Sequence, residues 1–223
     1  MKKEELDAFE KKFGYQPTAV KVSIDALAVF VHKDNPIKGL SMQQVDSIFS
    51  SSFTAGGKDV ASWDQVGLAP WAGKAISLNG RNSASGTYCY FKEVALKKGD
   101  FKSTVKEQPG SSAVVQGISA DQYGIGYSGI GYVTSSVRAL PLSAKPKGKQ
   151  IAATYENCLS GDYPLARFLL IYVNKKPGEP LPATALEFLK YVLSVEGQTI
   201  VEKDGYYPLP AEVAAEMVES ISK

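Results

Sequence analysis

The stretch "AISLNGRNSASGTYCYFKEVAL" (residues 75–96) joins a short β-strand to a helix through a polar loop. Residues 75–80 have the short, partly apolar pattern of a strand that ends at a glycine. In the second half, Tyr88, Phe91 and Ala95 recur at helical spacing and therefore share one face. Because a strand followed at once by an amphipathic helix is the building unit of α/β proteins, the stretch predicts an α/β fold.

The rest of the chain alternates between strand and helix patterns in the same way. Strands are predicted at 18–32 and 167–174, the second fully buried because its apolar run is continuous. The glycine-rich residues 123–133 are expected to lead into a further strand. Ser41 and Gln44 have the spacing of a capping box at a helix start. Helices are predicted at 1–14, 40–51, 111–121, 183–195, 198–205 and 211–223, and a loop at 53–67.

The composition is that of an ordinary globular protein. The 223 residues are 44% hydrophobic, which suffices for one large domain or two smaller lobes. The 25 basic and 23 acidic residues almost cancel, and the basic cluster at 145–149 is expected on a solvated loop, so nucleic acid is not an expected partner. No apolar run approaches the roughly 20 residues of a membrane span, and no signal peptide is recognisable, which leaves the compartment open.

Few residues are suited to metal or nucleophilic chemistry. Cys89 and Cys158 stand far apart and outside any CxxC arrangement, so we predict neither a zinc site nor a redox motif, while a disulfide between them stays open. His32 is the only histidine, and we expect it on the surface at the end of the strand 18–32. We therefore expect no catalytic residue, no metal and no cofactor.

Glycine motifs for nucleotide phosphates are absent or out of context. Gly124, Gly126 and Gly129 match the spacing GxGxxG, but they do not open a helix and no acidic residue follows at the required distance. We expect these glycines to serve turns and close backbone approach. A P-loop needs a GK[ST] sequence, and no lysine lies between Gly80 and Thr87. Dinucleotide binding and P-loop nucleotide hydrolysis are therefore not expected.

The residues before the helix at 86 gather hydrogen-bond donors suited to an anion. A helix start leaves backbone N–H groups without partners and carries partial positive charge. Gly86 permits close approach to the backbone, while the hydroxyls of Ser85 and Thr87 can each donate a hydrogen bond. Arg81 adds a planar, two-pronged donor that matches a tetrahedral oxyanion. On residue chemistry alone, these four residues form either a phosphate or sulfate site or only an N-cap.

The segment "GRNSASGTYCYFKE" (80–93) resembles the signature of the phosphate-binding proteins of bacterial phosphate ABC transporters, the PstS-like family. That signature is an arginine, a short spacer, and Ser-Gly-Thr at the start of a helix. Further blocks look like those of the family and occur in its order, so that the resemblance covers nearly the whole chain. Among them are "DALAVFVHKDNPIKGLSMQQVDSIFS" (25–50), "GIGYVTSS" (129–136) and "YPLARFLLIYVNKKPG" (163–178).

This resemblance implies a periplasmic-binding-protein-like fold of type II, in which two α/β lobes close on the ion about a hinge. Residues 1–33 and 166–223 would form the first lobe, and residues 34–165 the second lobe with the anion site. Family members carry an N-terminal segment before the point that matches Met1, with further phosphate ligands. The first lobe is therefore expected to be incomplete at its N-terminus, and a second chain is one way of completing it.

The same resemblance assigns roles at the site. Arg81 would be the charge partner of inorganic phosphate, Ser85 and Thr87 would bind through hydroxyl and backbone donors, and Gly86 through its N–H. The implied partner is the membrane permease of a phosphate ABC transporter, and the implied location is periplasmic or extracellular, associated with the cell surface. The family also uses a carboxylate that accepts a hydrogen bond from protonated phosphate and repels sulfate. Asp25 is the candidate, although an ordinary strand aspartate is the simpler interpretation.

Two other classes of function stay open beside this one. An enzyme would use Ser83 or Ser85 as the nucleophile in phosphoryl or acyl transfer, but no histidine or lysine lies near in sequence to act as the base. A module that keeps the fold but has lost ligand binding would act in sensing or protein interaction. Phosphate binding by a non-enzymatic protein is the function that the sequence favours.

Overall fold

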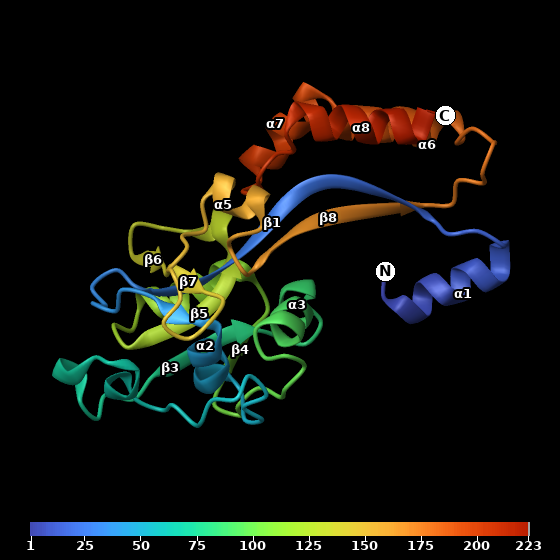
Figure 1. Cartoon of the computed structure of the whole chain (residues 1–223). Coiled ribbons are helices and arrows are strands. Elements are labelled where there is room, and N and C mark those ends of the chain that lie inside the picture. Colours follow the sequence, from blue (N-terminus) through green and yellow to red (C-terminus); the bar gives the residue numbers. More distant parts are fainter. Residues whose placement is uncertain (223) are drawn as a thin grey trace. The chain divides into compact units, whose positions relative to one another are not determined.

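The computed structural model describes residues 1–222, and their contacts group into two compact units (Figure 1). Unit 1 combines Met1–Asp25 with Phe168–Lys223, and unit 2 is Ala26–Arg167. The chain passes from one unit to the other within strands β1 (Thr18–His32) and β8 (Ala166–Val173). The lobe boundaries predicted after residues 33 and 165 stay a prediction.

Unit 1 is built mainly from helices. Helix α1 (Lys3–Phe13) has glutamates in its first turn and lysines in its last, which complements the helix dipole, and it ends at Gly14 with a φ of 81°. Near the C-terminus, α6 packs against both α7 and α8, and Figure 1 shows the three on one side of β1 and β8. Their bounds are Ala183–Leu193, Val195–Lys203 and Ala211–Ser222. The four helices predicted here are confirmed, with residue 223 outside the described residues.

Unit 2 contains most of a mixed sheet with the strand order β4-β3-β5-β1-β6, in which β8 also pairs with β1. Strand β3 is parallel to both β4 and β5, whereas β1 is antiparallel to β5 and β6. A smaller sheet pairs β2 with β7 in parallel. The bounds are β2 Leu40–Ser41, β3 Ser77–Arg81, β4 Lys106–Gln108, β5 Gly124–Gly129, β6 Val137–Ala139 and β7 Leu142–Ser143.

Helices connect the three parallel strands in sequence. Helix α3 (Gly86–Val94) leads from β3 to β4, and α4 (Ser111–Ser119) leads from β4 to β5. Because the strands are parallel, both helices start at the same carboxyl edge of the sheet. Arg81 at the end of β3 pairs with Gln108 at the end of β4, so the two helix starts are neighbours.

Aromatic rings hold α2 (Met42–Phe49) and α3 against the sheet. Phe91 of α3 stacks on Tyr127 of β5 with ring centroids 3.8 Å apart, and Phe49 of α2 meets both rings edge-on. All three side chains are fully buried. On α3, Phe91 and Ala95 are buried and Tyr88 is half-buried, which confirms the predicted apolar face. The ring stack therefore fixes the direction in which α3 leaves the sheet.

Ser41 and Gln44 cap α2 (Met42–Phe49) reciprocally, as predicted. The Gln44 N–H donates to Ser41 Oγ at 3.2 Å, and the Ser41 N–H donates to Gln44 Oε1 at 2.9 Å. Among the described residues, the other helices of unit 2 are α5 (Tyr155–Ser160) and the 3₁₀ helices Trp63–Val66, Ala69–Trp71 and Ile130–Tyr132. The first of these 3₁₀ helices interrupts the predicted loop.

The glycine-rich segment forms strand β5 itself, so the prediction that it only leads into a strand was wrong. A Cβ on Gly126 would lie 2.6 Å from the carbonyl oxygen of Asn79 on β3 and would also meet the side chains of α4. The glycine therefore lets helix, strand and neighbouring strand approach closely. The expectation of close backbone approach is confirmed at this position.

Two predictions about burial were also wrong. Strand β8 is half-buried along most of its length, and Leu170 is 40% exposed. A continuous apolar run is typical of a strand covered on both faces, but in Figure 1 helices α6–α8 lie on one side of β8. The side chain of His32 is only 15% exposed instead of lying on the surface, and its Nδ1 accepts a hydrogen bond from the Asp34 N–H at 3.2 Å.

Candidate anion site

Ser85 is the N-cap of helix α3. Its N–H donates to the carbonyl oxygen of Asn82 at 3.1 Å, which closes the loop after β3. Its Oγ accepts a hydrogen bond from the Thr87 N–H, also at 3.1 Å. The interpretation of Ser85 as an N-cap is thus confirmed. Because the oxygen only accepts in this bond, the hydroxyl proton of Ser85 is still available for a ligand.

The start of α3 is open at Gly86. A Cβ on Gly86 would meet no atom within 4 Å. Within residues 1–222, no hydrogen bond occupies the Gly86 N–H or the Thr87 hydroxyl. The Thr87 N–H, in contrast, is already bound to Ser85. Of the two donors expected from Thr87, the hydroxyl is therefore the one that remains for a ligand.

Arg81, at the end of β3, is held at the start of α4 by neutral acceptors. Its Nη1 donates to Ser111 Oγ at 2.7 Å, and its Nη2 donates to the carbonyl oxygen of Pro109 at 3.3 Å. Its Nε is buried and has no hydrogen-bond partner. No carboxylate contacts Arg81 among the described residues. The positive charge of the guanidinium is therefore not neutralised by an acidic side chain.

Tyr127, which lies close to the end of β3, adds no negative charge to the site. The Tyr127 hydroxyl lies under the same strand end, where a Cβ on Gly80 would approach it to 3.1 Å. Burial raises the pKa of this hydroxyl, so Tyr127 stays neutral at physiological pH. Partial positive charge from the starts of α3 and α4 comes in addition. The electrostatics of this edge of the sheet thus favour an anion.

Ser111 is a residue of this site that the sequence analysis missed. It is the first residue of α4 and is buried, with 9% of its surface exposed. The available signal was the Ser-Ser pair that opens the predicted helix 111–121. Its contact with Arg81 joins residues 30 positions apart. That contact depends on the pairing of β3 with β4, which no local pattern reveals.

Arg81, Ser85, Gly86 and Thr87 all lie in unit 2, at the end of β3 and the start of α3, whereas Asp25 belongs to unit 1. Asp25 is the last residue of the N-terminal part of unit 1 and is 7% exposed. It engages in interactions of its own. Its role toward an anion stays a prediction.

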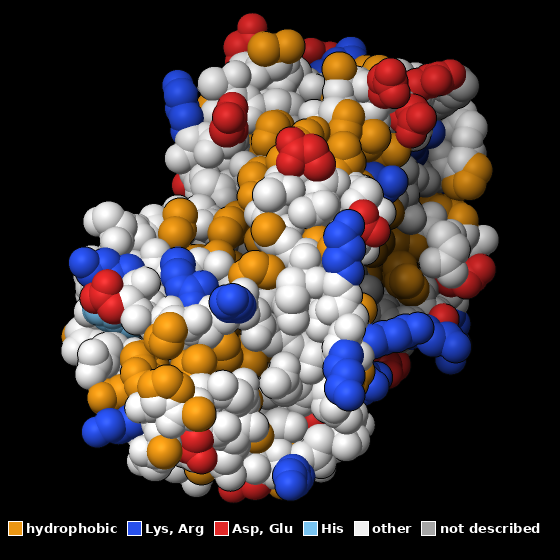
Figure 2. All heavy atoms as spheres, turned by 60° about the vertical axis from the view of Figure 1, so that its left-hand side comes forward, with side chains coloured by type: hydrophobic (Ala, Val, Ile, Leu, Met, Phe, Trp, Pro, Cys, Tyr) orange, Lys and Arg blue, Asp and Glu red, His pale blue; other side chains and the backbone are white. Residues whose placement is uncertain are grey.

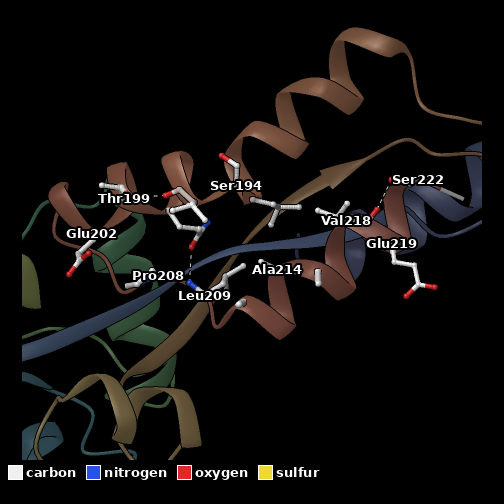
Figure 3. Close-up of a pocket in the computed structure, with 14 residues that line it drawn as sticks. Ser194, Thr199, Glu202, Pro208, Leu209, Ala214, Val218, Glu219 and Ser222 are labelled. Carbon is white, nitrogen blue, oxygen red and sulfur yellow. Dashed lines mark hydrogen bonds between the residues drawn. The ribbon is translucent and has the colours of Figure 1, made fainter.

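A cavity within unit 1 has a chemistry that does not suit an anion. It has a volume of about 720 Å³ and lies between α7 and α8. Figure 3 shows the side chains that line it, which are mainly apolar, such as Leu209, Ala214 and Val218, together with the acidic Glu202 and Glu219. No lysine, arginine or histidine lines it. Acidic groups without a cation repel phosphate, so we do not assign the anion to this cavity.

The described residues were also searched for a metal site, a disulfide and a base next to Ser85. Residues 1–222 contain no group of three or more histidine, cysteine, aspartate or glutamate side chains that could hold a metal ion. Cys89 is exposed on α3 and Cys158 is buried on α5, and no disulfide joins them. The one hydrogen bond that the structure records for the Ser85 hydroxyl comes from a backbone N–H, not from a base. Among the described helices, none combines the length and the apolar character needed to cross a membrane.

A family model and the sequences of known proteins indicate the same family for this chain. The model of the PBP superfamily domain matches residues 1–196. The phosphate-binding protein PstS of Pseudomonas aeruginosa is 56% identical over 223 residues, which cover 99% of this chain and 69% of the relative. Protein SphX of Synechococcus elongatus is 31% identical over 215 residues, covering 95% of this chain and 61% of the relative.

Solved structures agree in fold. A possible phosphate binding protein from Planctomyces limnophilus has a TM-score of 0.77 at 27% identity, covering 99% of this chain and 76% of that one. A putative phosphate ABC transporter substrate-binding protein from Clostridium perfringens was solved with bound phosphate. It has a TM-score of 0.69 at 25% identity, and the match covers 94% of this chain and 76% of that one. The mixed α/β architecture is thus that of the type II binding proteins. The chain belongs to the PBP superfamily and, within it, to the family of PstS phosphate-binding proteins.

Proposed function

We propose that this chain binds inorganic phosphate and serves as the solute-binding component of a phosphate ABC transporter. The observation that carries the proposal is Arg81, which is held only by neutral acceptors and stands at the end of the strand whose loop leads to the open start of α3. An uncompensated guanidinium next to helix N–H groups matches a tetrahedral oxyanion. The names of two similar proteins support phosphate as that oxyanion: the P. aeruginosa relative is a phosphate-binding protein, and the C. perfringens structure holds phosphate.

Each residue has a separate role in this proposal. Arg81 supplies charge and N–H donors, and Gly86 supplies its backbone N–H to an oxygen that approaches without steric hindrance. Ser85 and Thr87 donate their hydroxyl protons. Binding by these groups is reversible and involves no covalent step, so the chain acts as a binding protein and not as an enzyme.

The proposal extends to the two lobes. Residues 1–33 with 166–223 would form one lobe and residues 34–165 the other, with the ion held between them. We propose Asp25 as the carboxylate that accepts a hydrogen bond from protonated phosphate and discriminates against sulfate. The chain spans 69% of the P. aeruginosa protein, and a second chain that completes the first lobe would be a source of further donors.

The proposed partner and location follow from the transporter role. A solute-binding component delivers its ligand to the membrane permease of the same transporter. We therefore propose that the chain acts in the periplasm or outside the cell, associated with the cell surface. The name of the C. perfringens protein, a putative substrate-binding protein of a phosphate ABC transporter, supports this role.

Isothermal titration calorimetry with phosphate and with sulfate tests the proposal. We expect the chain to bind phosphate and Arg81→Ala to weaken binding about 10- to 150-fold, because each hydrogen bond to a charged group contributes about 1.5–3 kcal/mol. Lys92→Ala is the matched control, since Lys92 is a cation on α3 whose charge is paired with Asp100 at 2.8 Å. Its affinity should equal that of the wild type.

Other outcomes would favour the other classes of function. A folded chain that takes up neither oxyanion would contradict the proposal and favour a sensing or interaction module. Equal losses in Arg81→Ala and Lys92→Ala would point to general electrostatics instead of a site. Hydrolysis of a phosphoester that disappears in Ser85→Ala would favour an enzyme.

A further inference from the structure

Ser111 links three neighbouring elements at the proposed site. Its hydroxyl oxygen accepts the 2.7 Å hydrogen bond from Arg81 at the end of β3. Its carbonyl oxygen accepts a hydrogen bond from the hydroxyl of Ser128 on β5 at 3.4 Å. Ser111 is nearly buried and Ser128 fully buried, and Ser111 itself opens α4. Because its backbone is held by the sheet and the helix, Ser111 gives Arg81 a fixed point of attachment.

A fixed attachment matters because arginine is a long, flexible side chain. Ordering a free arginine on a ligand costs side-chain entropy. A side chain already held in place does not incur this cost when the ligand binds. With Nη1 on Ser111 and Nη2 on Pro109, the guanidinium is oriented before an anion arrives.

The neutrality of Ser111 is as important as its position. A carboxylate in its place would also hold Arg81, but it would neutralise the charge that attracts the anion and would repel the anion itself. A serine hydroxyl holds the guanidinium and leaves its charge uncompensated. The oxygen of Ser111 acts only as an acceptor in this bond, as that of Ser85 does at the start of α3.

We propose that Ser111 is a positioning residue for anion binding, which orients Arg81 without neutralising it. This inference rests on the proposed binding of phosphate through Arg81. It adds α4 to the elements on which the affinity depends, although α4 itself carries none of the four proposed ligands.

The experiment is a set of phosphate titrations by calorimetry, with thermal unfolding of each variant. Ser111→Ala should weaken phosphate binding about fivefold, because one hydrogen bond that orients Arg81 is lost. Ser111→Thr keeps the hydroxyl and should restore most of the affinity. Ser112→Ala is the matched control, since Ser112 is the exposed neighbour in the same helical turn, and it should leave the affinity unchanged.

Ser111→Asp separates positioning from a merely structural role. We expect this variant to unfold at or above the wild-type temperature, because an acidic residue at a helix start and beside Arg81 is favourable. Its phosphate affinity should nevertheless fall at least about tenfold. Stability and affinity thus change in different directions. Retained affinity in Ser111→Asp would overturn the proposal that the acceptor must be neutral.

A double-mutant cycle tests whether Ser111 acts through Arg81. In the Arg81→Ala background, with binding followed at millimolar phosphate, Ser111→Ala should change the affinity less than about twofold. Full additivity of the two substitutions would overturn the inference, as would wild-type affinity in Ser111→Ala. If Arg81→Ala weakens binding while Ser111 variants do not, only the role of Ser111 fails. If the wild type itself takes up no phosphate, both the proposed function and the role of Ser111 fail.

Discussion

The two units bury their apolar side chains to very different degrees. All the largest fully buried side chains except Ile24 belong to unit 2, among them Trp63, Phe91 and Tyr127. Unit 1 buries Leu189 and Ile221, but four of its large apolar side chains are more than half exposed, namely Phe188, Tyr191, Val195 and Ile200. On the upper part of Figure 2, where α6–α8 lie, hydrophobic side chains are interspersed with acidic ones. Unit 2 therefore has an apolar core of its own, while unit 1 depends more on specific polar contacts.

Gln198 of α7 makes three polar contacts within unit 1. Its Nε2 donates to the carbonyl oxygens of Val22 and Val192 at 3.0 and 2.9 Å, and its Oε1 accepts from the Leu209 N–H at 2.7 Å. Gln198 is 9% exposed. One side chain thus joins strand β1, helix α6 and the segment before α8. A buried polar junction of this kind can take over part of the role of an apolar core.

Phe91→Ala should have the largest effect on stability. It removes a fully buried ring from the stack in unit 2, which costs about 3–5 kcal/mol. Phe188→Ala in unit 1 is the matched control, because Phe188 is 57% exposed and its loss should change the free energy of unfolding by no more than about 0.5 kcal/mol. Urea denaturation measures both. Equal losses would contradict the contrast between the units.

Gln198→Ala should destabilise the chain by about 2–3 kcal/mol, since it leaves two carbonyl oxygens and one N–H without their partner. Hydrogen exchange followed by mass spectrometry should locate the effect in unit 1. Gln122→Ala, at an exposed position of unit 2, should leave exchange unchanged. Faster exchange in unit 2 alone would show that Gln198 is not the junction of unit 1.

The helix caps of the two units should differ by a smaller amount of stability. Ser41→Ala in unit 2 should cost about 1 kcal/mol, because the hydroxyl of Ser41 accepts from the Gln44 N–H and forms part of a capping box. Ser194 caps α7 of unit 1 by accepting from the Gly197 N–H at 3.2 Å. Its replacement by alanine should cost about 0.5 kcal/mol. Urea denaturation that gave the reverse order would contradict the comparison.

Asp46 should have the smallest effect, and one that depends on pH. Its Oδ2 accepts from the Ala55 N–H at 2.9 Å, but its buried Oδ1 has no partner. Burial raises the pKa of Asp46 above its ordinary value of 3.8. The ionised form is thus less favourable in the folded chain, so Asp46 contributes its stability at low pH and loses it as the pH rises through the raised pKa.

Asp46→Asn removes this titration and keeps an oxygen for the Ala55 N–H. We expect the free energy of unfolding of the variant, relative to the wild type, to increase as the pH rises from 3.8 and then to level off. Thermal unfolding between pH 3 and 8 measures the difference. A difference that does not change with pH would contradict the assignment.

The sequence predicted the features that depend on neighbouring residues. The Ser41–Gln44 capping box and the Ser85 cap lie within one helical turn, and both are confirmed. The buried face of α3 follows from helical spacing alone. Such features need no knowledge of the tertiary fold, which is why the helices and the residues at the start of α3 could be predicted.

The sequence did not predict the features that depend on which strands pair and which helices cover them. The strand at Gly124–Gly129 lacks the side chains typical of strands, and the proximity of Asn79 on β3 and of the side chains of α4 explains the glycine at 126. The half-burial of β8 depends on which helices cover it. The contact of Arg81 with Ser111 likewise requires the register of β3 and β4.

The positions of the two cysteines have a practical consequence. Cys89 is exposed on α3, close in sequence to Thr87, and Cys158 is buried on α5. A thiol-reactive dye would attach at Cys89 and spare Cys158, because reaction requires an accessible thiolate. The dye would sit in the first turn of the helix whose start carries the proposed ligands. The natural sequence thus already holds the attachment point for a fluorescent anion reporter, with no cysteine to add or remove.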